Sequence, residues 1–413
     1  MSDAQVIVVG GGPAGSATAF FLARAGIDVV VIDRARFPRD KTCSEYMSPQ
    51  ASRVLADMDA LEAVEASGAA QLAGMRVHSP GGAVIHGEFA AAHGFRGYRD
   101  RGLAVRRTIL DAILLERAKR AGARVEEETR VVDVVMDDGG RVRGVMTLDS
   151  KGRTAARSAR LVVGADGLRS VIGRRLGLIR SAGWPRRIAL VTHYSGVDGV
   201  RDFGEMHVDR RGYCGLANVG GGLTNVAVVV PVSQAADVAV DRTEFLESWI
   251  AERPQLAEKF TRATRVEPVR ATGPFASSAR RGWAPGAALV GDAAEFFDPF
   301  TGEGIYTALR GGELLAGFAA ESVRADQSAR AELPLREYER ARRAEFSGKW
   351  KVERLVGAAI AFPFIIDRAA KVLSKRRDMA DLLVGVVGDF VPAREVLRPR
   401  YLLSLLLPVS GGA

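Results

Sequence analysis

The sequence predicts an α/β fold with a parallel sheet between helices, a separate antiparallel sheet and a helical C-terminal region. Three observations support it. The first 35 residues read as a strand, a glycine turn, a helix and a second strand. Residues 75–89 and 188–232 are rich in β-branched residues and interrupted by glycine turns, and from about residue 331 the pattern is helical to the end. With 413 residues, 47% of them hydrophobic, the chain is long enough for two or three domains.

The N-terminal segment carries a phosphate-binding pattern. A short buried strand, VIVVG, runs into the turn Gly10-x-Gly12-x-x-Gly15 and then into a helix, and a second buried strand, DVVVID, ends at Asp33. Gly10 allows the tight turn, Gly12 lets the backbone approach a pyrophosphate, and Gly15 lets helix and strand pack closely. The helix N-terminus supplies free N–H groups. Asp33 stands where an acceptor for ribose hydroxyls belongs, so the segment predicts a dinucleotide site.

Two later segments indicate which dinucleotide binds. LVVGADGLRS is a strand that runs into the turn Asp166-Gly167, and AALVGD is a strand that ends at Gly291-Asp292, before a loop and another helix. Asp292 could accept hydrogen bonds from a chain of hydroxyl groups, which FAD has in its ribitol and a nicotinamide dinucleotide lacks. The N-terminus of the last helix would face the flavin edge that carries negative charge when reduced. The segments therefore predict FAD.

These segments, with the helix-forming stretch VRRTILDAILLERAKRAG, resemble the flavoprotein fold shared by para-hydroxybenzoate hydroxylase-type monooxygenases, geranylgeranyl reductases and flavin-dependent halogenases. The resemblance covers roughly residues 4–320. It implies pyrophosphate at the glycine turn, adenosine ribose at Asp33, ribitol at Asp292, flavin near Pro299 and a cofactor contact by Arg107, for which an exposed helix charge is the alternative. The expected cofactor-binding residues are Gly10, Gly12, Pro13, Ala14, Gly15, Asp33, Arg34, Lys41, Cys43, Arg107, Asp166, Gly291, Asp292, Pro299, Gly302, Glu303, Gly304 and Ile305.

The cofactor segments are separated by strand-rich insertions. We expect a discontinuous, Rossmann-like FAD-binding domain from residues 1–75, 97–178 and 272–330, an antiparallel β-sheet substrate domain from 76–96 and 179–271, and a helical C-terminal region from 331–413. The sheet would cover the flavin and leave the substrate pocket between the two domains. Its strands are apolar, which predicts an apolar substrate that bears a ring or is polyunsaturated, such as an aromatic, polyketide or isoprenoid-like compound. No second strand–glycine–helix pattern occurs, so NAD(P)H, the expected electron donor, would bind transiently.

One of the two cysteines, Cys43, lies in the polar stretch DKTCSEYMSP, which leaves the sheet at its cofactor end. Geranylgeranyl reductases carry Lys-x-Cys beside the flavin, followed by Ser-Pro, and Lys41-x-Cys43 with Ser48-Pro49 matches this pattern. Cys43 is therefore expected in the flavin pocket, with a solvent-facing loop cysteine as the alternative. Cys43 and Tyr213 are the expected catalytic residues. Other polar residues of the predicted sheet that could face the pocket are His193, Tyr194 and His207.

The reaction type stays open between hypotheses. Geranylgeranyl reductases usually carry Tyr-x-Trp-x-Phe-Pro, but here the segment reads GYCGLANV, with Gly215 in place of the tryptophan. The Trp-x-Trp-x-Ile-Pro signature of halogenases is absent too. The first hypothesis is an NAD(P)H-driven monooxygenase, the second a C=C reductase in which Cys43 supplies the proton, and the third a non-enzymatic flavin-bound redox or membrane-associated protein. The missing motif favours oxygenation slightly.

Charge is uneven along the chain. The net charge is +9, and residues 340–377 hold 11 Lys/Arg against 3 acids. No nucleic-acid module accompanies this region, so no nucleic-acid partner is expected. Its apolar stretches are shorter than the roughly 20 residues of a membrane span, which leaves peripheral contact with an anionic membrane or simple packing on the core. The histidines are scattered and the cysteines lack ligand spacing, so no metal site is expected. With two cysteines and no signal peptide, the expected location is cytoplasmic.

Overall fold

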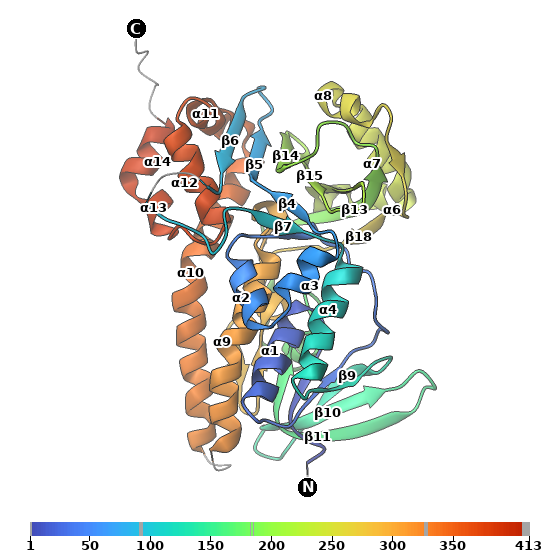
Figure 1. Ribbon diagram of the computed structural model, residues 1–413. Helices are drawn as coiled ribbons and strands as arrows, with labels where there is room; N and C mark the ends of the chain where they lie inside the picture. Colours follow the sequence, from blue (N-terminus) through green and yellow to red (C-terminus); the bar gives the residue numbers. More distant parts are fainter. Residues whose placement is uncertain (1, 91–93, 182, 185, 326–328, 407–413) are drawn as a thin grey trace.

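The computed structural model describes residues 2–90, 94–181, 183–184, 186–325 and 329–406 (Figure 1). An eight-stranded sheet forms the cofactor half, and its central path has the order β20–β21–β11–β1–β2–β8. All neighbours on this path are parallel except β20 and β21. Two further strands extend β11 as an antiparallel meander. The strands are β1 (Ala4–Val9), β2 (Val29–Ile32), β8 (Arg124–Glu126), β9 (Arg130–Met136), β10 (Val142–Leu148), β11 (Thr154–Gly164), β20 (Trp283–Ala284) and β21 (Ala287–Leu289).

Three helices cover one face of this sheet: α1 (Pro13–Arg24), α4 (Arg107–Arg120) and α9 (Gly304–Arg324). The parallel strands are buried on both faces, as the continuous apolar sequence of β1 requires. Val6 and Val8 pack toward the helices, whereas Ile7 and Val9 pack into the core on the other face. A Cβ atom at Gly312 would lie 2.8 Å from the Ala14 oxygen, so this glycine lets α9 approach α1 closely.

A second eight-stranded sheet lies above the first in Figure 1. Its main path runs β17–β13–β16–β15–β14–β5–β6, with β18 paired to β13. The predicted meander is correct for β14, β15 and β16, but β13 lies beyond β16, and β5 joins β14 in parallel. The strands are β5 (Gly74–His78), β6 (Val84–Glu88), β13 (Arg187–Ser195), β14 (Phe203–Asp209), β15 (Gly212–Asn218), β16 (Leu223–Pro231), β17 (Thr264–Arg265) and β18 (Arg270–Thr272).

The outer face of the second sheet is covered by helices that the sequence analysis did not predict. They are α6 (Ala235–Val240), α7 (Arg242–Ala251) and α8 (Pro254–Ala257). Leu246 and Trp249 of α7 pack with Cys214 and Val228 of the sheet in one buried cluster. The inner face is therefore left to face the cofactor half.

Short elements join the two halves. One three-stranded sheet contains β3 (Tyr46–Met47), β4 (Ala70–Leu72) and β7 (Gly102–Ala104), and another contains β12 (Ile179–Ser181), β19 (Ser277–Ala279) and β22 (Glu295–Phe296). Three short helices are α2 (Ala51–Asp57), α3 (Leu61–Ala66) and α5 (Val171–Arg175). Strand β3 begins three residues after Cys43, so pairing of β3 with β7 anchors the end of the cysteine loop.

The C-terminal region is helical through the last described residue, as predicted. It contains α10 (Leu333–Ala361), α11 (Pro363–Leu373), α12 (Arg377–Val387), α13 (Arg394–Leu397) and α14 (Pro399–Leu406). Residues 407–413, part of the same prediction, lie outside the described residues. Among the described helices, none combines the length and apolarity that crossing a bilayer would need. The predicted α/β fold class, with its two sheets and helical C-terminal region, is confirmed.

Candidate active site

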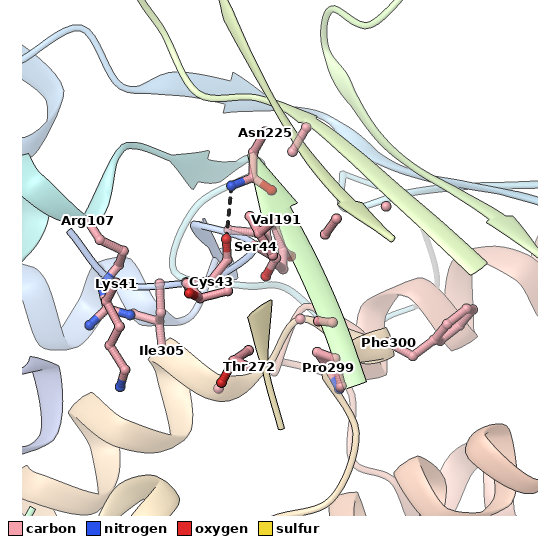
Figure 2. A pocket seen from close by; sticks show the side chains of 18 of the residues that line it. Lys41, Cys43, Ser44, Arg107, Val191, Asn225, Thr272, Pro299, Phe300 and Ile305 are labelled. Atoms are coloured by element: carbon pink, nitrogen blue, oxygen red, sulfur yellow. Dashed lines mark hydrogen bonds between the residues drawn. The ribbon is translucent and has the colours of Figure 1, made fainter. Parts of the chain in front are cut away.

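A pocket lies between the cofactor half and the inner face of the second sheet (Figure 2). The glycine turn, the cysteine loop and the start of α9 line it from below, and β13 to β16 line it from above. Many residues expected to bind the cofactor meet here although they come from distant segments. The predicted residues that line the pocket are Gly12, Pro13, Ala14, Lys41, Cys43, Arg107, Asp292, Pro299, Gly302, Gly304 and Ile305.

The glycine turn has the shape that a pyrophosphate needs. Gly10 has φ +103°, and a Cβ atom there would lie 2.5 Å from the Ala165 oxygen. A Cβ atom at Gly15 would lie 1.8 Å from the Gly10 oxygen, so Gly10 and Gly15 shape the turn without lining the pocket. The atom nearest to a Cβ atom at Gly12 would be Arg39 Nη2, at 3.5 Å, so the backbone at Gly12 is open to a ligand. Helix α1 begins there without a side-chain cap, so its N–H groups and positive dipole end fit the FAD pyrophosphate.

Asp33 supports the turn from behind. Its carboxylate is buried, and Oδ2 accepts a hydrogen bond from the Gly11 N–H at 2.7 Å. It is not among the pocket-lining residues, although a carboxylate oxygen keeps a second lone pair that could accept from a ribose hydroxyl. Arg34, the next residue, is exposed and does not line the pocket.

Three other predicted residues do not line the pocket. Asp166 Oδ2 accepts from the Val171 N–H at 2.6 Å at the start of α5, and burial raises the pKa of Asp166. Gly291, with φ +62°, forms the turn after β21. The carboxyl group of Glu303 is enclosed in the core, and this burial raises its pKa. The pKa of nearby Tyr46 is raised by burial and then by the charge of Glu303. These side chains shape the surroundings of the pocket rather than its surface.

The flavin end of the pocket combines a helix N-terminus with an ion pair. Gly304 and Ile305, at the start of α9, line the pocket, and α9 has no side-chain cap. Its positive dipole end therefore faces the pocket, where it suits the negative edge of a reduced flavin. Lys41 Nζ lies 3.7 Å from Asp292, and both side chains are partly exposed. Lys41 and Asp292 therefore offer a donor and an acceptor to which the hydroxyl groups of a ribitol could bind.

Arg107 is buried at the start of α4 and holds a fixed charge beside the pocket. Its Nε and Nη2 each lie 2.7 Å from the Asp111 carboxylate, which Arg39 also contacts at 2.8 Å. Burial lowers the pKa of Arg107, but the charge of Asp111 and a contact with the Cys43 thiol outweigh it, so the pKa is raised. Arg107 is thus not the exposed helix charge of the alternative interpretation, and its guanidinium lies beside Cys43.

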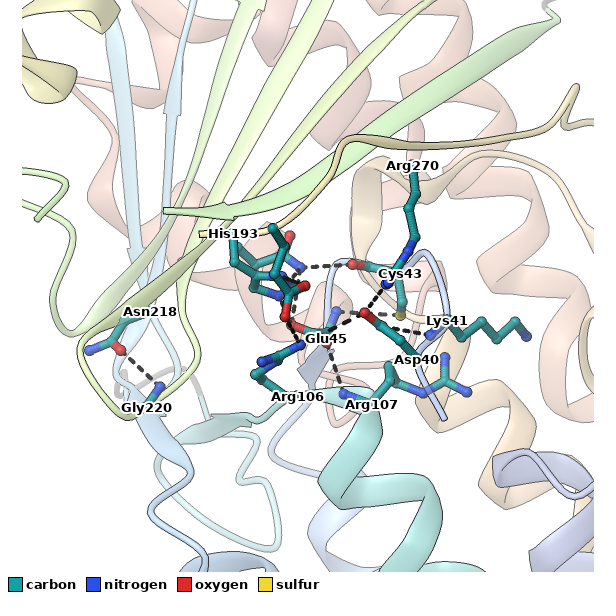
Figure 3. Close-up of polar contacts among 12 residues, drawn as sticks. Asp40, Lys41, Cys43, Glu45, Arg106, Arg107, His193, Asn218, Gly220 and Arg270 are labelled. Carbon is teal, nitrogen blue, oxygen red and sulfur yellow. Dashed lines mark hydrogen bonds and ion pairs between the residues drawn. The ribbon is translucent and has the colours of Figure 1, made fainter. Parts of the chain in front are cut away.

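Cys43 lines the pocket and is half-buried, which favours the expected pocket position over the alternative of a solvent-facing loop cysteine. Its loop is clamped by polar contacts (Figure 3). Asn225 Nδ2 of β16 donates to the Cys43 carbonyl at 2.9 Å and to Glu45 Oε2 at 3.1 Å. The Arg107 N–H donates to Glu45 Oε1 at 2.8 Å, and the Glu45 N–H points to Cys43 Sγ at 3.3 Å.

His193 extends this clamp toward the surface. Its Nε2 lies 2.7 Å from Glu45 Oε2, and its Nδ1 lies 3.0 Å from Glu267 Oε2. Burial lowers the pKa of His193, but the hydrogen bond and charge of Glu45, with the charge of Glu267, raise it above its usual value. Glu267 in turn pairs with Arg106. We call Glu45, His193, Asn225 and Glu267 the clamp; the sequence analysis considered His193 and missed the other three.

The roof of the pocket is apolar. Residues two apart on each strand face it, as strand geometry requires. Gly215, where geranylgeranyl reductases carry a tryptophan, lies in this roof, and a Cβ atom there would be 3.2 Å from Met206 Sδ. The apolar roof residues are Ala189, Val191, Met206, Ala217, Ala227 and Val229.

Tyr213 also lines the pocket, but its hydroxyl is engaged. It donates to Asp298 Oδ1 at 2.6 Å, and Arg187 Nη1 contacts Asp298 Oδ2 at 2.6 Å. Burial, followed by the charge of Asp298, raises the pKa of Tyr213 well above its usual value. This arrangement argues against the expected catalytic role, because the phenol proton is held by the carboxylate. The ring packs edge-on against Phe300, with centroids 5.0 Å apart.

Tyr194 and His207, the other polar residues considered on the sheet, do not line the pocket. Tyr194 packs in the outer core beneath α7. His207 pairs with Glu205, which is itself one of the pocket-lining residues. His78, Glu205 and His207 come together there, with one potential ligand atom of each within 4.8 Å of the others. Lys259 Nζ lies 3.1 Å from Glu205 Oε2, so an ammonium group already balances this carboxylate. We therefore assign no metal to the cluster.

Comparison with known proteins agrees with this geometry. The family described as FAD binding domain matches residues 3–347. A digeranylgeranylglycerophospholipid reductase of Methanosarcina acetivorans is 29% identical over 326 residues, covering 77% of this chain and 75% of that protein. A menaquinone reductase of Mycolicibacterium smegmatis is 29% identical over 408 residues, covering 94% and 92%.

The fold is also shared with solved structures. The myxobacterial chondrochloren halogenase CndH superposes with a TM-score of 0.79 at 23% identity, covering 98% of each chain. At this identity the similarity supports the fold alone. The family match extends over most of the chain and includes the glycine turn, the cysteine loop and the start of α9. The chain therefore belongs to the FAD binding domain family and is an FAD-dependent oxidoreductase.

Proposed function

We propose that this enzyme reduces a carbon–carbon double bond in an apolar, isoprenoid-type substrate, with NAD(P)H as the electron donor. The observation that carries the proposal is the clamped position of Cys43, whose loop is held in the pocket opposite an apolar roof. A half-buried thiol held in this way can present a proton to a substrate that lies beneath the roof. When bound, reduced FAD supplies a hydride to the substrate.

The residues of the chain bind the substrate and donate the proton. The roof binds the hydrocarbon and excludes water, which strengthens the polar contacts inside the pocket. The thiol of Cys43 gives its proton to one carbon as the hydride reaches the other, so that the double bond gains two hydrogens, and the thiolate is then reprotonated from solvent. Arg107 stabilises the thiolate, because its buried positive charge contacts the sulfur.

The relatives support the substrate class. Two relatives that match over at least three quarters of their length are named as reductases of a geranylgeranyl phospholipid and of menaquinone, and both compounds carry isoprenoid chains. An isoprenoid chain suits a roof built from alanine, valine and methionine.

Product mass tests the proposal. The FAD-loaded enzyme is reduced with NADPH or dithionite without oxygen and given a geranylgeranyl phospholipid or a menaquinone. After any quinol has been reoxidised in air, a gain of two hydrogens located in the isoprenoid chain is the expected result. Cys43→Ala should slow this step. Tyr46→Phe, which removes a buried hydroxyl group from another residue that lines the pocket, should not. Failure to convert either substrate, or an equal defect in both variants, would contradict the assignment.

Oxygenation is the second candidate, and Gly215 favours it. The segment lacks the tryptophan of Tyr-x-Trp-x-Phe-Pro, and the thioether of Met206 lies beside Gly215 instead, so a flexible side chain would contact a ring-bearing substrate here. Under air with NADPH, this reaction would add one oxygen atom to the product and would not depend on the Cys43 thiol. The mass of the product and the effect of Cys43→Ala on its formation therefore distinguish the two reactions.

A further inference from the structure

Large apolar side chains are exposed together where α10 turns into α11. Phe362 is 51% exposed, Phe364 79% and Ile365 37%, and nearby Trp184 is 58% exposed. The rings of Trp184 and Phe362 contact each other, with centroids 5.9 Å apart. Single exposed apolar residues are common on protein surfaces, whereas a contiguous group marks a binding surface. We call these four residues the aromatic tip.

Basic residues lie beside the aromatic tip. In α11, Phe364, Arg368 and Lys371 are spaced by four and then three residues, so they share one face of the helix. Lys375 lies just beyond the end of α11, in the turn that follows it. Lys371 and Lys375 are exposed and form no ion pair with any described residue. One helix face therefore presents an aromatic ring followed by cations.

The aromatic tip also adjoins the wall of the active site. Ile360 and Ile366, on either side of the turn, point inward and pack in the cluster that contains Met206 and Tyr213 of the pocket. The turn thus has an inner side that supports the pocket and an outer side that exposes aromatic rings. A hydrophobic phase that contacts the outer side would lie close to the active site.

We propose that the aromatic tip and the adjoining lysines dock the enzyme onto the surface of an anionic lipid bilayer. Phe and Trp side chains insert at the boundary between headgroups and acyl chains, and Lys and Arg attract anionic lipids. Docking against a second copy is disfavoured, because a symmetric contact would bring the two basic rows together. The proposal does not depend on which reaction the enzyme catalyses.

The experiment measures binding of the FAD-loaded full-length protein to phosphatidylcholine vesicles with and without phosphatidylglycerol, by co-sedimentation. The wild type should bind mainly the anionic vesicles. The double variant Phe362→Ser/Phe364→Ser should bind about tenfold more weakly, because two aromatic rings no longer enter the interface. Replacing Lys371 and Lys375 by Gln should weaken binding about fivefold for each lysine. Val240→Ser, at a residue 88% exposed on α6, is the matched control and should bind like the wild type.

Flavin absorbance and the melting temperature establish that each variant is folded before binding is compared. Equal vesicle binding by the wild type and the double serine variant would overturn the proposal. Failure of the wild type to bind vesicles that contain phosphatidylglycerol would overturn it as well. Sedimentation velocity tests the alternative that a second copy of this chain binds the aromatic tip. If the wild type self-associates and the double variant is monomeric, with no difference in vesicle binding, the aromatic tip is an interface between copies of this chain.

Discussion

Replacing Glu45 with Gln should destabilise the protein and displace Cys43 without changing the size of the side chain. Glu45 has φ +62°, a backbone conformation that costs a non-glycine residue of the order of 1–3 kcal/mol. Its carboxylate is buried and accepts hydrogen bonds from the Arg107 N–H, from Asn225 Nδ2 and from His193. These bonds offset the backbone strain.

The size of the effect follows from these partners. An amide has one accepting oxygen, so in the Gln variant its NH₂ group would face either the Arg107 N–H or the His193 and Asn225 donors. One charge-assisted hydrogen bond is then lost, which costs about 1.5–3 kcal/mol. Glu45→Ala would leave more donors unpaired and should cost about 3–5 kcal/mol. Glu267→Gln is the matched control, because the Glu267 side chain is 21% exposed and its pairing with His193 should contribute about 0–1 kcal/mol.

The pH dependence gives the effect a distinct signature. The pKa of His193 is higher in the folded protein than in the unfolded chain. Protonated His193 therefore contributes stability that is fully present below the unfolded pKa, near 6.5, and is lost as the pH rises through the folded pKa. Without the Glu45 charge the folded pKa falls, so this loss with rising pH should shrink in Glu45→Gln.

Urea titration of the FAD-loaded protein, followed by tryptophan fluorescence from pH 5.5 to 8.5, measures both quantities. Stopped-flow measurement of flavin reduction and of substrate reduction in the same variant reports on the position of Cys43. If Glu45→Gln keeps the urea midpoint, the pH dependence and the rate of substrate reduction of the wild type, the clamp does not hold the cysteine loop. If Glu267→Gln lowers the free energy of unfolding as much as Glu45→Gln does, the buried carboxylate of Glu45 contributes no more than the partly exposed one of Glu267, which contradicts the prediction.

Other variants test the remaining parts of the site. Gly12→Val should abolish FAD binding, measured by flavin content after reconstitution, because a branched side chain would fill the open side of the turn. Cys43→Ala should keep FAD and slow substrate reduction by about 10²-fold or more, as loss of a general acid does, whereas Cys214→Ala, buried on the outer face of the sheet, should leave that rate unchanged. Tyr213→Phe should lower the free energy of unfolding by about 2 kcal/mol, because Asp298 loses a buried donor, with little change in rate. A tenfold or larger rate loss in Tyr213→Phe would restore its expected catalytic role.

The parts of the site that the sequence predicted are those built from consecutive residues. The strand, glycine turn and helix at the N-terminus form a local unit, so spacing alone identifies it. Arg34 and Glu303 do not line the pocket, because neighbours of a contacting residue need not face the same space, and a cofactor contact by either stays a prediction. His193 and Asn225 lie directly opposite each other on paired strands, a register that depends on β13 lying beside β16. A meander in chain order, which the sequence predicts, would separate the strand of His193 from that of Asn225 and keep these two side chains apart.

The cysteine loop belongs to the cofactor half by sequence, yet contacts from the second sheet hold it. Asn225 and His193 bind its C-terminal part, and Arg270, beside the same sheet, pairs with Asp40 at its N-terminal part. A change in the position of the sheet would therefore move the Cys43 thiol relative to the glycine turn and the start of α9. Substrate that packs beneath the roof stabilises that position, so binding energy from an unreactive hydrocarbon chain can contribute to placing the proton donor. On this argument, shortening the chain of a reducible substrate should lower the rate of reduction as well as its binding, and an effect on binding alone would show that the loop is fixed before substrate arrives.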